Sequence, residues 1–146
     1  MEGGGAAIQT GAGLGGKTMS LYVKTTSKDF ESAGRDLEEA VKRHKFGVLH
    51  SLDLKATLRE KGVDLPNRCR ILDVCNPQRA SQVLKRDISV NMALPCRISV
   101  YEEGGKVKIG MISPLTLLEL FPSSERLRDV AEEVERETIQ MIDEAV

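Results

Sequence analysis

The sequence predicts an α/β fold of the α+β kind: a mostly antiparallel sheet of about five strands with helices packed on it. Three observations indicate this class. Two strand-length runs, 97–102 and 106–112, are separated only by Glu103-Gly104-Gly105, and paired glycines accept the positive φ angles of a tight hairpin. The chain ends in a long helical apolar stripe of the kind that covers one sheet face. The order β-α-β-α-β-α-β-β-α-α, with its late hairpin, favours a largely antiparallel or mixed sheet.

A single domain is expected between Met19 and Val146. A chain of 146 residues with 40% hydrophobic residues is large enough to build one core. The residues before this domain, MEGGGAAIQTGAGLGGKT, hold seven of the thirteen glycines and show no apolar period. We therefore expect residues 1–18 to be a disordered, glycine-rich leader.

The first part of the domain alternates strands with helices. Leu21 and Val23 alternate with polar neighbours, which predicts a first strand. Ser27 is expected to cap a helix that ends near Phe46-Gly47, and a second strand should follow over 48–52. The apolar face of this helix has the three-and-four spacing of a buried stripe and comprises Phe30, Ala33, Leu37, Ala40 and Val41.

The start of the next long helix is the sharpest local signal in the chain. A helical turn over 55–61, ended by Gly62, precedes an apolar run of strand length over 70–75. Asn76 and Pro77 follow directly. Asn is favoured as a helix cap, and Pro needs no amide donor in the first turn. They predict a helix to about residue 85, with a polar loop after it.

Two helices are expected to close the chain. Ser113-Pro114 should open a short helix that runs through Phe121, and a long amphipathic helix should begin near Ser124. Its acidic residues from Glu132 to Glu137 are expected to form a solvated face, paired with neighbouring arginines at helical spacing. Its buried stripe is expected to comprise Leu127, Val130, Ala131, Val134, Thr138, Met141, Ile142 and Ala145.

The segment GAGLGGKT, residues 11–18, satisfies the phosphate-loop pattern and contains a dinucleotide-type glycine pattern. Such a loop must follow a buried strand and open a helix whose N-terminus faces the phosphates. Here a glycine-rich stretch precedes it, and residues 20–25, which alternate like a strand, follow it. We therefore reject nucleotide binding at this motif.

Composition and charge narrow the possible partners. Lys and Arg, 21 together, nearly balance the 22 Asp and Glu, and aromatic residues make up only 3%. Nucleic acid is therefore not an expected partner, because the chain has neither excess positive charge nor aromatic platforms. No membrane span or secretion signal is recognisable, and three cysteines are an odd number, so we expect a cytoplasmic protein with free thiols.

Cys75 and Cys96 are the residues with the clearest chemical potential. Cys75 ends a predicted strand just before a helix cap, where backbone amides and the helix dipole lower the pKa of a thiol. Cys96 follows Pro95 at the start of the next strand. If these two strands run antiparallel, the two cysteines lie at one edge of the sheet. A buried, inert role for each thiol is the competing interpretation.

The two histidines carry weaker signals. His44 ends the first predicted helix, where a cation offsets the helix dipole. His50 lies within a strand and could ligate a metal, but the chain has no Cys-x-x-Cys, so no metal site is predicted and no cofactor is indicated.

Several motifs, in order along residues 19–146, resemble the bacterial and archaeal family called domain of unknown function 302. Shorter matches are the Phe46-Gly47 turn, Asp53 with Thr57 and Leu58, Lys61-Gly62 and Ser113-Pro114. The longer matches are Val74-Cys75-Asn76-Pro77 with Ala80 and Leu84, Leu94-Pro95-Cys96-Arg97, Val100-Tyr101-Glu102 and Gly104-Gly105-Lys106-Val107.

This resemblance implies a small α+β fold with a TATA-binding-protein-like architecture, and a homodimer. It implies no activity, because the family has none established. Some members carry Ile-Asp-His where this chain has Leu52-Asp53-Leu54, and Gly-Asn-Pro where it has Cys75-Asn76-Pro77. The chain therefore resembles a cysteine-bearing branch, and a role of that histidine does not transfer to it.

Three functions compete. The first is a dimeric binding module for a small anionic or sulfur-containing ligand. The second is a thiol redox or sulfur-transfer enzyme that uses Cys75 as nucleophile and Cys96 to resolve it. The third is a dimer that binds a metal or haem at His50 or a cysteine. The sequence does not decide whether the protein is an enzyme. The candidate site comprises Cys75 and Cys96 as catalytic residues and Asn76, Pro77, Pro95, Arg97 and Asp53 as ligand-binding residues.

Overall fold

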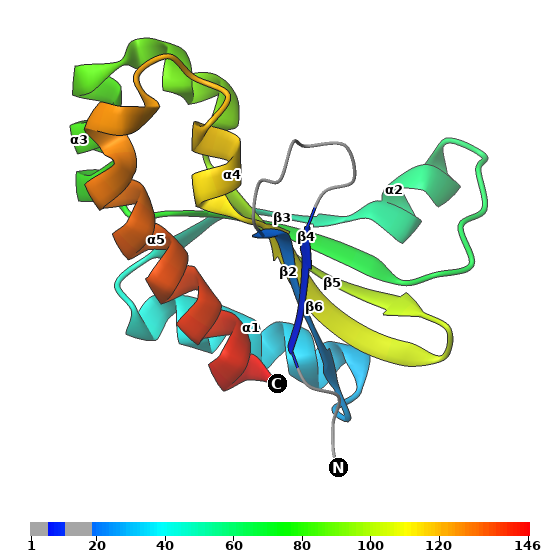
Figure 1. The fold of residues 1–146 in the computed structure, drawn as a ribbon. Coiled ribbons are helices and arrows are strands. Elements are labelled where there is room, and N and C mark those ends of the chain that lie inside the picture. The colour runs from blue at the N-terminus through cyan, green and yellow to red at the C-terminus, as the bar shows by residue number, and fades with distance from the viewer. Residues whose placement is uncertain (1–5, 11–18) are drawn as a thin grey trace.

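The computed structural model describes residues 6–10 and 19–146. Their strands form one antiparallel sheet, in the order β1 (Ala6–Thr10), β2 (Met19–Thr26), β6 (Lys106–Ile112), β5 (Cys96–Glu103), β4 (Cys69–Cys75) and β3 (Gly47–Asp53). Helices α1 (Phe30–Arg43) and α5 (Ser124–Ala145) pack on one face of this sheet (Figure 1). Helices α3 (Pro77–Arg86) and α4 (Pro114–Leu118) lie beyond one of its ends, and α2 (Leu54–Glu60) lies towards the other. The predicted α+β class is confirmed.

The sheet has one strand more than expected, at the N-terminus. Residues Ala6–Thr10 form β1, which pairs antiparallel with β2, Met19–Thr26. The expectation of a leader without structure is therefore wrong for residues 6–10. The glycines of the leader lie on either side of residues 6–10. The edge of β2 supplies the hydrogen-bond partners for this strand, and such a distant partner cannot be recognised from the local sequence.

The rest of the leader, residues 1–5 and 11–18, lies outside the described residues. The rejected phosphate-loop motif falls there. The element that follows it is the strand β2, as expected, rather than the helix that a phosphate loop requires.

Helix α1 spans Phe30–Arg43, and its cap lies two residues later than predicted. Asp29, not Ser27, caps it, and the Asp29 carboxylate accepts a hydrogen bond of 2.8 Å from the amide of Ser32. The chain leaves the helix through Lys45, which has a φ of 65°. The predicted apolar stripe of this helix is buried.

The Asn76-Pro77 prediction is confirmed. Strand β3, Gly47–Asp53, leads to the short helix α2, Leu54–Glu60, and strand β4 spans Cys69–Cys75. Helix α3 is Pro77–Arg86, and the side-chain oxygen of Asn76 accepts hydrogen bonds of 3.1 Å from the amides of Gln78 and Arg79. The predicted polar loop after α3 is a 3-10 helix, η1, at Ile88–Ala93.

The hairpin joins β5, Cys96–Glu103, to β6, Lys106–Ile112, and the φ angles of Gly104 and Gly105 are 59° and 76°. Helix α4, Pro114–Leu118, is shorter than predicted, and α5 spans Ser124–Ala145.

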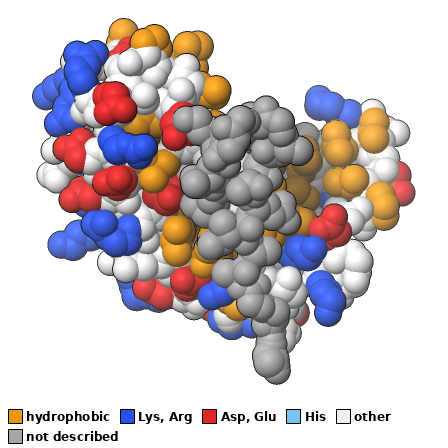
Figure 2. Space-filling view, in the orientation of Figure 1, with side chains coloured by type: hydrophobic (Ala, Val, Ile, Leu, Met, Phe, Trp, Pro, Cys, Tyr) orange, Lys and Arg blue, Asp and Glu red, His pale blue; other side chains and the backbone are white. Residues whose placement is uncertain are grey.

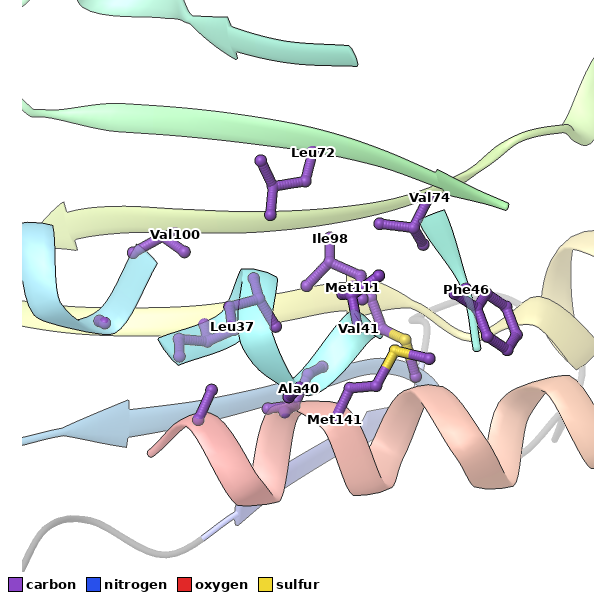
Figure 3. Close-up of a cluster of buried hydrophobic side chains, with 14 of the residues drawn as sticks. Leu37, Ala40, Val41, Phe46, Leu72, Val74, Ile98, Val100, Met111 and Met141 are labelled. Carbon is purple, nitrogen blue, oxygen red and sulfur yellow. The ribbon is translucent and has the colours of Figure 1, made fainter. Parts of the chain in front are cut away.

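Two clusters of buried side chains hold these elements together. The main one lies between the sheet and helices α1 and α5, where Leu72, Val74, Ile98 and Val100 face Leu37, Val41 and Met141 (Figure 3). A smaller one lies among η1, α4 and the first half of α5, and comprises Val90, Leu118, Leu127 and Ala131. Helix α5 contributes to both clusters, so it anchors α3, η1 and α4, which lie beyond the end of the sheet, to the main core. Among the residues described, no helix could cross a membrane.

Candidate functional site

A cavity of about 580 Å³ lies where the sheet meets the helical unit of α3, η1, α4 and α5. Its walls are mostly apolar. The helices contribute Ala80, Val83, Val90, Leu117, Leu118, Val130, Ala131 and Val134, and the strands contribute Leu21, Val23, Val74, Met111 and Ile112. The second buried cluster therefore forms part of its wall.

Antiparallel pairing brings the two segments singled out in the sequence to this cavity. Strand β4 ends beside the start of β5, and Val74 lies opposite Cys96. Cys75, Asn76, Pro95, Cys96 and Arg97 all line the cavity. The peptide bond between Leu94 and Pro95 is cis.

Two of the candidate ligand-binding residues lie elsewhere. Pro77 is exposed in the first turn of α3 and is not part of the wall. Asp53 pairs with Arg70 in the sheet, five residues along β4 from Cys75, a distance of about 17 Å along a strand. Its carboxylate caps α2 through a 3.0 Å hydrogen bond from the amide of Ala56. Asp53 thus has a structural role at the far end of the sheet.

The helix start does not activate Cys75. The two amides that could stabilise its thiolate already donate to the side chain of Asn76. Burial raises the pKa of Cys75, which is the opposite of the direction expected from its position before a helix. The sequence-based expectation of a lowered pKa is therefore corrected: desolvation by burial raises it.

Cys96 is held still more firmly in its protonated form. Burial, and then repulsion from Cys75, raise its pKa to about 11. The effect of Cys75 on this pKa is consistent with the two cysteines being close neighbours. Near neutral pH, both side chains are uncharged thiols that contribute to an apolar wall.

A row of polar side chains crosses the face of the sheet away from α1 and α5. His50 on β3 lies opposite Asp73 on β4, which in turn lies opposite Arg97 on β5. The Nδ1 atom of His50 is 3.9 Å from Asp73 Oδ2, and Arg97 Nε is 3.6 Å from Asp73 Oδ1. Arg97 is 67% exposed, and with Asp73 it forms a polar rim to the cavity.

Arg79 is a partly buried polar residue of the wall that the sequence did not predict. Its Nη2 atom is 2.6 Å from Glu137 Oε2 and 3.7 Å from Glu133 Oε1 on α5. Its Nη1 atom is buried and has no hydrogen-bond partner among the described residues. A buried donor without a partner costs about 1–3 kcal/mol.

The acidic face of α5 makes ion pairs outside its own helix. It was expected to be solvated and paired within its own helix, but Glu133 and Glu137 pair with Arg79 across to α3. Arg128 has a partner of the expected kind, Glu132, at 3.9 Å. The sequence signal for this ion pair is a single arginine, Arg79, on the inner face of α3, but its partner Glu137 is 58 positions away in the chain.

Neither histidine is placed as a metal ligand. His44 pairs with Glu144 of α5 at 2.8 Å, and His50 is exposed. Within residues 6–10 and 19–146, no group of three or more His, Cys, Asp or Glu side chains is arranged to hold a metal ion.

Comparisons with known proteins agree with this architecture. Residues 22–145 match the family model described as "Domain of unknown function DUF302". A crystal structure of an uncharacterised conserved DUF302 protein from Bacillus stearothermophilus is 34% identical in sequence to this chain. It aligns with a TM-score of 0.84 over 88% of this chain and 100% of the other. No curated protein matches the chain.

Proposed function

Given that this chain belongs to the DUF302 family of domains of unknown function, we propose that it binds a small anionic ligand with an apolar body in the cavity beside β4 and β5. The observation that carries this proposal is the combination, in one cavity, of an apolar wall and an arginine at the rim. Sites for small molecules usually have volumes of about 300–1,000 Å³, apolar walls and a few polar groups that orient the ligand.

The apolar wall accounts for the body of the ligand. A cavity of about 580 Å³ where the sheet meets the helical unit holds a molecule of some tens of atoms, whose burial is favourable at about 25 cal/mol per Å² of apolar surface. The two neutral thiols on this wall are soft and polarizable, which also suits a ligand that contains sulfur.

The rim accounts for the anionic group. The Arg97 guanidinium lies mostly in solvent, and its contact with Asp73 is longer than a hydrogen bond. A carboxylate, sulfonate or similar group at the cavity entrance can therefore accept hydrogen bonds from Arg97 without first breaking a tight ion pair.

A thiol redox or sulfur-transfer reaction is less well supported. Such a reaction needs a thiolate near neutral pH, and the pKa values of Cys75 and Cys96 are both raised. The metal or haem hypothesis likewise has no arrangement of described side chains in its favour.

A matched pair of fluorescent probes tests the binding proposal. Anilinonaphthalene sulfonate carries the anionic group, and phenylnaphthylamine has the same apolar body without it. We expect both probes to bind in the cavity. Arg97→Gln should weaken binding of the sulfonate about 10-fold, the equivalent of about 1.4 kcal/mol, and leave the neutral probe unchanged.

Arg128→Gln is the control, because Arg128 is an exposed residue of α5 outside the cavity wall. It should change neither affinity. If neither probe binds the wild-type protein, or if both variants weaken both probes equally, the proposal is wrong.

We further propose that the protein is a homodimer in a reducing compartment such as the cytoplasm. All three cysteines are free, which suits such a compartment. Ile88, Met92 and Leu120 are large, exposed apolar side chains on η1 and just after α4, a region that Figure 2 shows as hydrophobic at the top of the helical unit. Native mass spectrometry measures the mass of the assembly and of any retained ligand. A monomer at micromolar concentration would contradict the dimer.

A further inference from the structure

We infer that Arg79 orients the ligand by donating a hydrogen bond from its Nη1 atom to an uncharged oxygen of the ligand body. The ligand is then an apolar carboxylic acid that also carries an oxo or hydroxy group. This inference rests on the proposed function, because it concerns the same cavity, and it adds the chemical class of the ligand.

Arg79 is held in place at two points, its backbone amide and its guanidinium group. Its backbone amide donates to the cap residue Asn76, so its position in the first turn of α3 is set. Its Nη2 atom is 2.6 Å from Glu137, which belongs to a different helix. A guanidinium group is planar, so fixing Nη2 also fixes the direction of the other N–H groups.

The remaining N–H groups on Nη1 are what the ligand could use. Nη1 is buried and, among the described residues, has no hydrogen-bond partner, although Arg79 lines the cavity. Nearly all buried donors in folded proteins have an acceptor, so each exception needs an explanation. A ligand oxygen in the cavity supplies one.

The charges around Arg79 indicate that this oxygen is neutral. One guanidinium lies within 4.0 Å of two carboxylates, Glu137 at 2.6 Å and Glu133 at 3.7 Å. A third carboxylate beside them would be repelled, whereas a carbonyl or hydroxyl oxygen accepts the hydrogen bond without adding charge. The acid group of the ligand therefore belongs at the rim with Arg97, and the neutral oxygen belongs inside.

Calorimetric titration of the wild-type protein with decanoate and with a series of oxodecanoates tests this arrangement. The series moves the carbonyl along the chain while the acid and the length stay constant. We expect one or two isomers to bind about 10-fold more tightly than decanoate, because they alone place an oxygen at Nη1.

Arg79→Lys is the informative variant. Lysine keeps the positive charge beside Glu137 but lacks the second donor group, so the preference for the favoured isomer should fall to about 1-fold while decanoate binding is retained. Glu133→Gln is the matched control, since it alters only the weaker 3.7 Å contact and should keep the preference.

A nitrogen-detected NMR spectrum of arginine-labelled protein provides a readout that is independent of whether the variant folds. The Nη resonances of Arg79 should shift with the favoured isomer and not with decanoate.

The outcomes separate this inference from the proposed function. If decanoate binds but no isomer is preferred, or if Arg79→Lys keeps the preference, Nη1 does not contact the ligand, and only the inference falls. Ordered water would then be its partner. If neither decanoate nor any isomer binds, both the inference and the proposed function are wrong.

Discussion

At the scale of single residues, the cavity wall contains two kinds of ionisable side chain, cysteine thiols and arginine guanidinium groups, in different surroundings. Burial raises the pKa values of Cys75 and Cys96, so both thiols are neutral near pH 7, whereas the guanidinium groups of Arg79 and Arg97 lie beside the carboxylates of Glu137 and Asp73. A neutral thiol adds to the apolar wall, and a charged guanidinium selects an acceptor. These surroundings suit the proposed binding function better than they suit nucleophilic attack by a thiolate.

The raised pKa of Cys96 makes a prediction about stability at alkaline pH. The unfolded chain loses the thiol proton near pH 9.0, whereas the folded protein keeps it to about pH 11. The contribution of this group is therefore complete below pH 9.0 and declines as the pH rises towards 11, by at most about 1.4 kcal/mol per pH unit. Urea unfolding of wild type and Cys96→Ala across this range measures it, and the variant should show the shallower decline.

The absolute stability of Cys96→Ala is not the readout, because the lost side-chain volume lowers it at every pH. Parallel curves for the two proteins between pH 8 and 11 would contradict a raised pKa.

At the scale of elements, local signals were sufficient where an element is determined by its own residues. The cap of α3 needs only Asn76 and Pro77, and the β5–β6 turn needs only Gly104 and Gly105. Features that depend on residues far apart in the sequence could not be predicted from it. Strand β1 exists through its pairing with β2, and the pKa of Cys75 depends on burial that only the folded chain creates. The Arg79–Glu137 pair joins two helices that are distant in the sequence. The edge of the cavity at β4 and β5 could therefore be predicted, but the buried donor of Arg79 could not.

Gly110 shows how closely β2 and β6 approach. It lies opposite Val23, and a Cβ atom there would be 2.9 Å from Val23 Cγ2 and 3.3 Å from the carbonyl oxygen of Tyr22. Because such contacts force neighbours apart, Gly110→Ala should destabilise the protein by about 1–3 kcal/mol in urea unfolding.

The double variant Val23→Ala/Gly110→Ala tests the cause. Removing the Val23 methyl groups should recover part of the loss, so the two effects should differ from additivity by about 1 kcal/mol. Strict additivity would mean that the crowding lies elsewhere, for example at the Tyr22 carbonyl.

At the scale of the whole molecule, α5 is the element that makes the cavity possible. Its second half packs in the main core through Met141 and Ile142, and its first half packs in the smaller cluster through Leu127. Between them, Val130 and Val134 form part of the cavity wall. One continuous helix therefore holds the helical unit at a fixed distance from the end of the sheet.

This continuity predicts that both clusters unfold together. Leu127→Ala and Met141→Ala remove fully buried side chains from opposite ends of α5, and each should lower the free energy of unfolding by about 2–5 kcal/mol. If the domain is one cooperative unit, both variants should show a single urea transition with an unchanged m value. Hydrogen exchange of α3 and α4 should accelerate no more in Leu127→Ala than exchange in the sheet. An early, separate loss of protection in α3 and α4 would instead make the helical unit an independent unit, whose opening would give the ligand its way into the cavity.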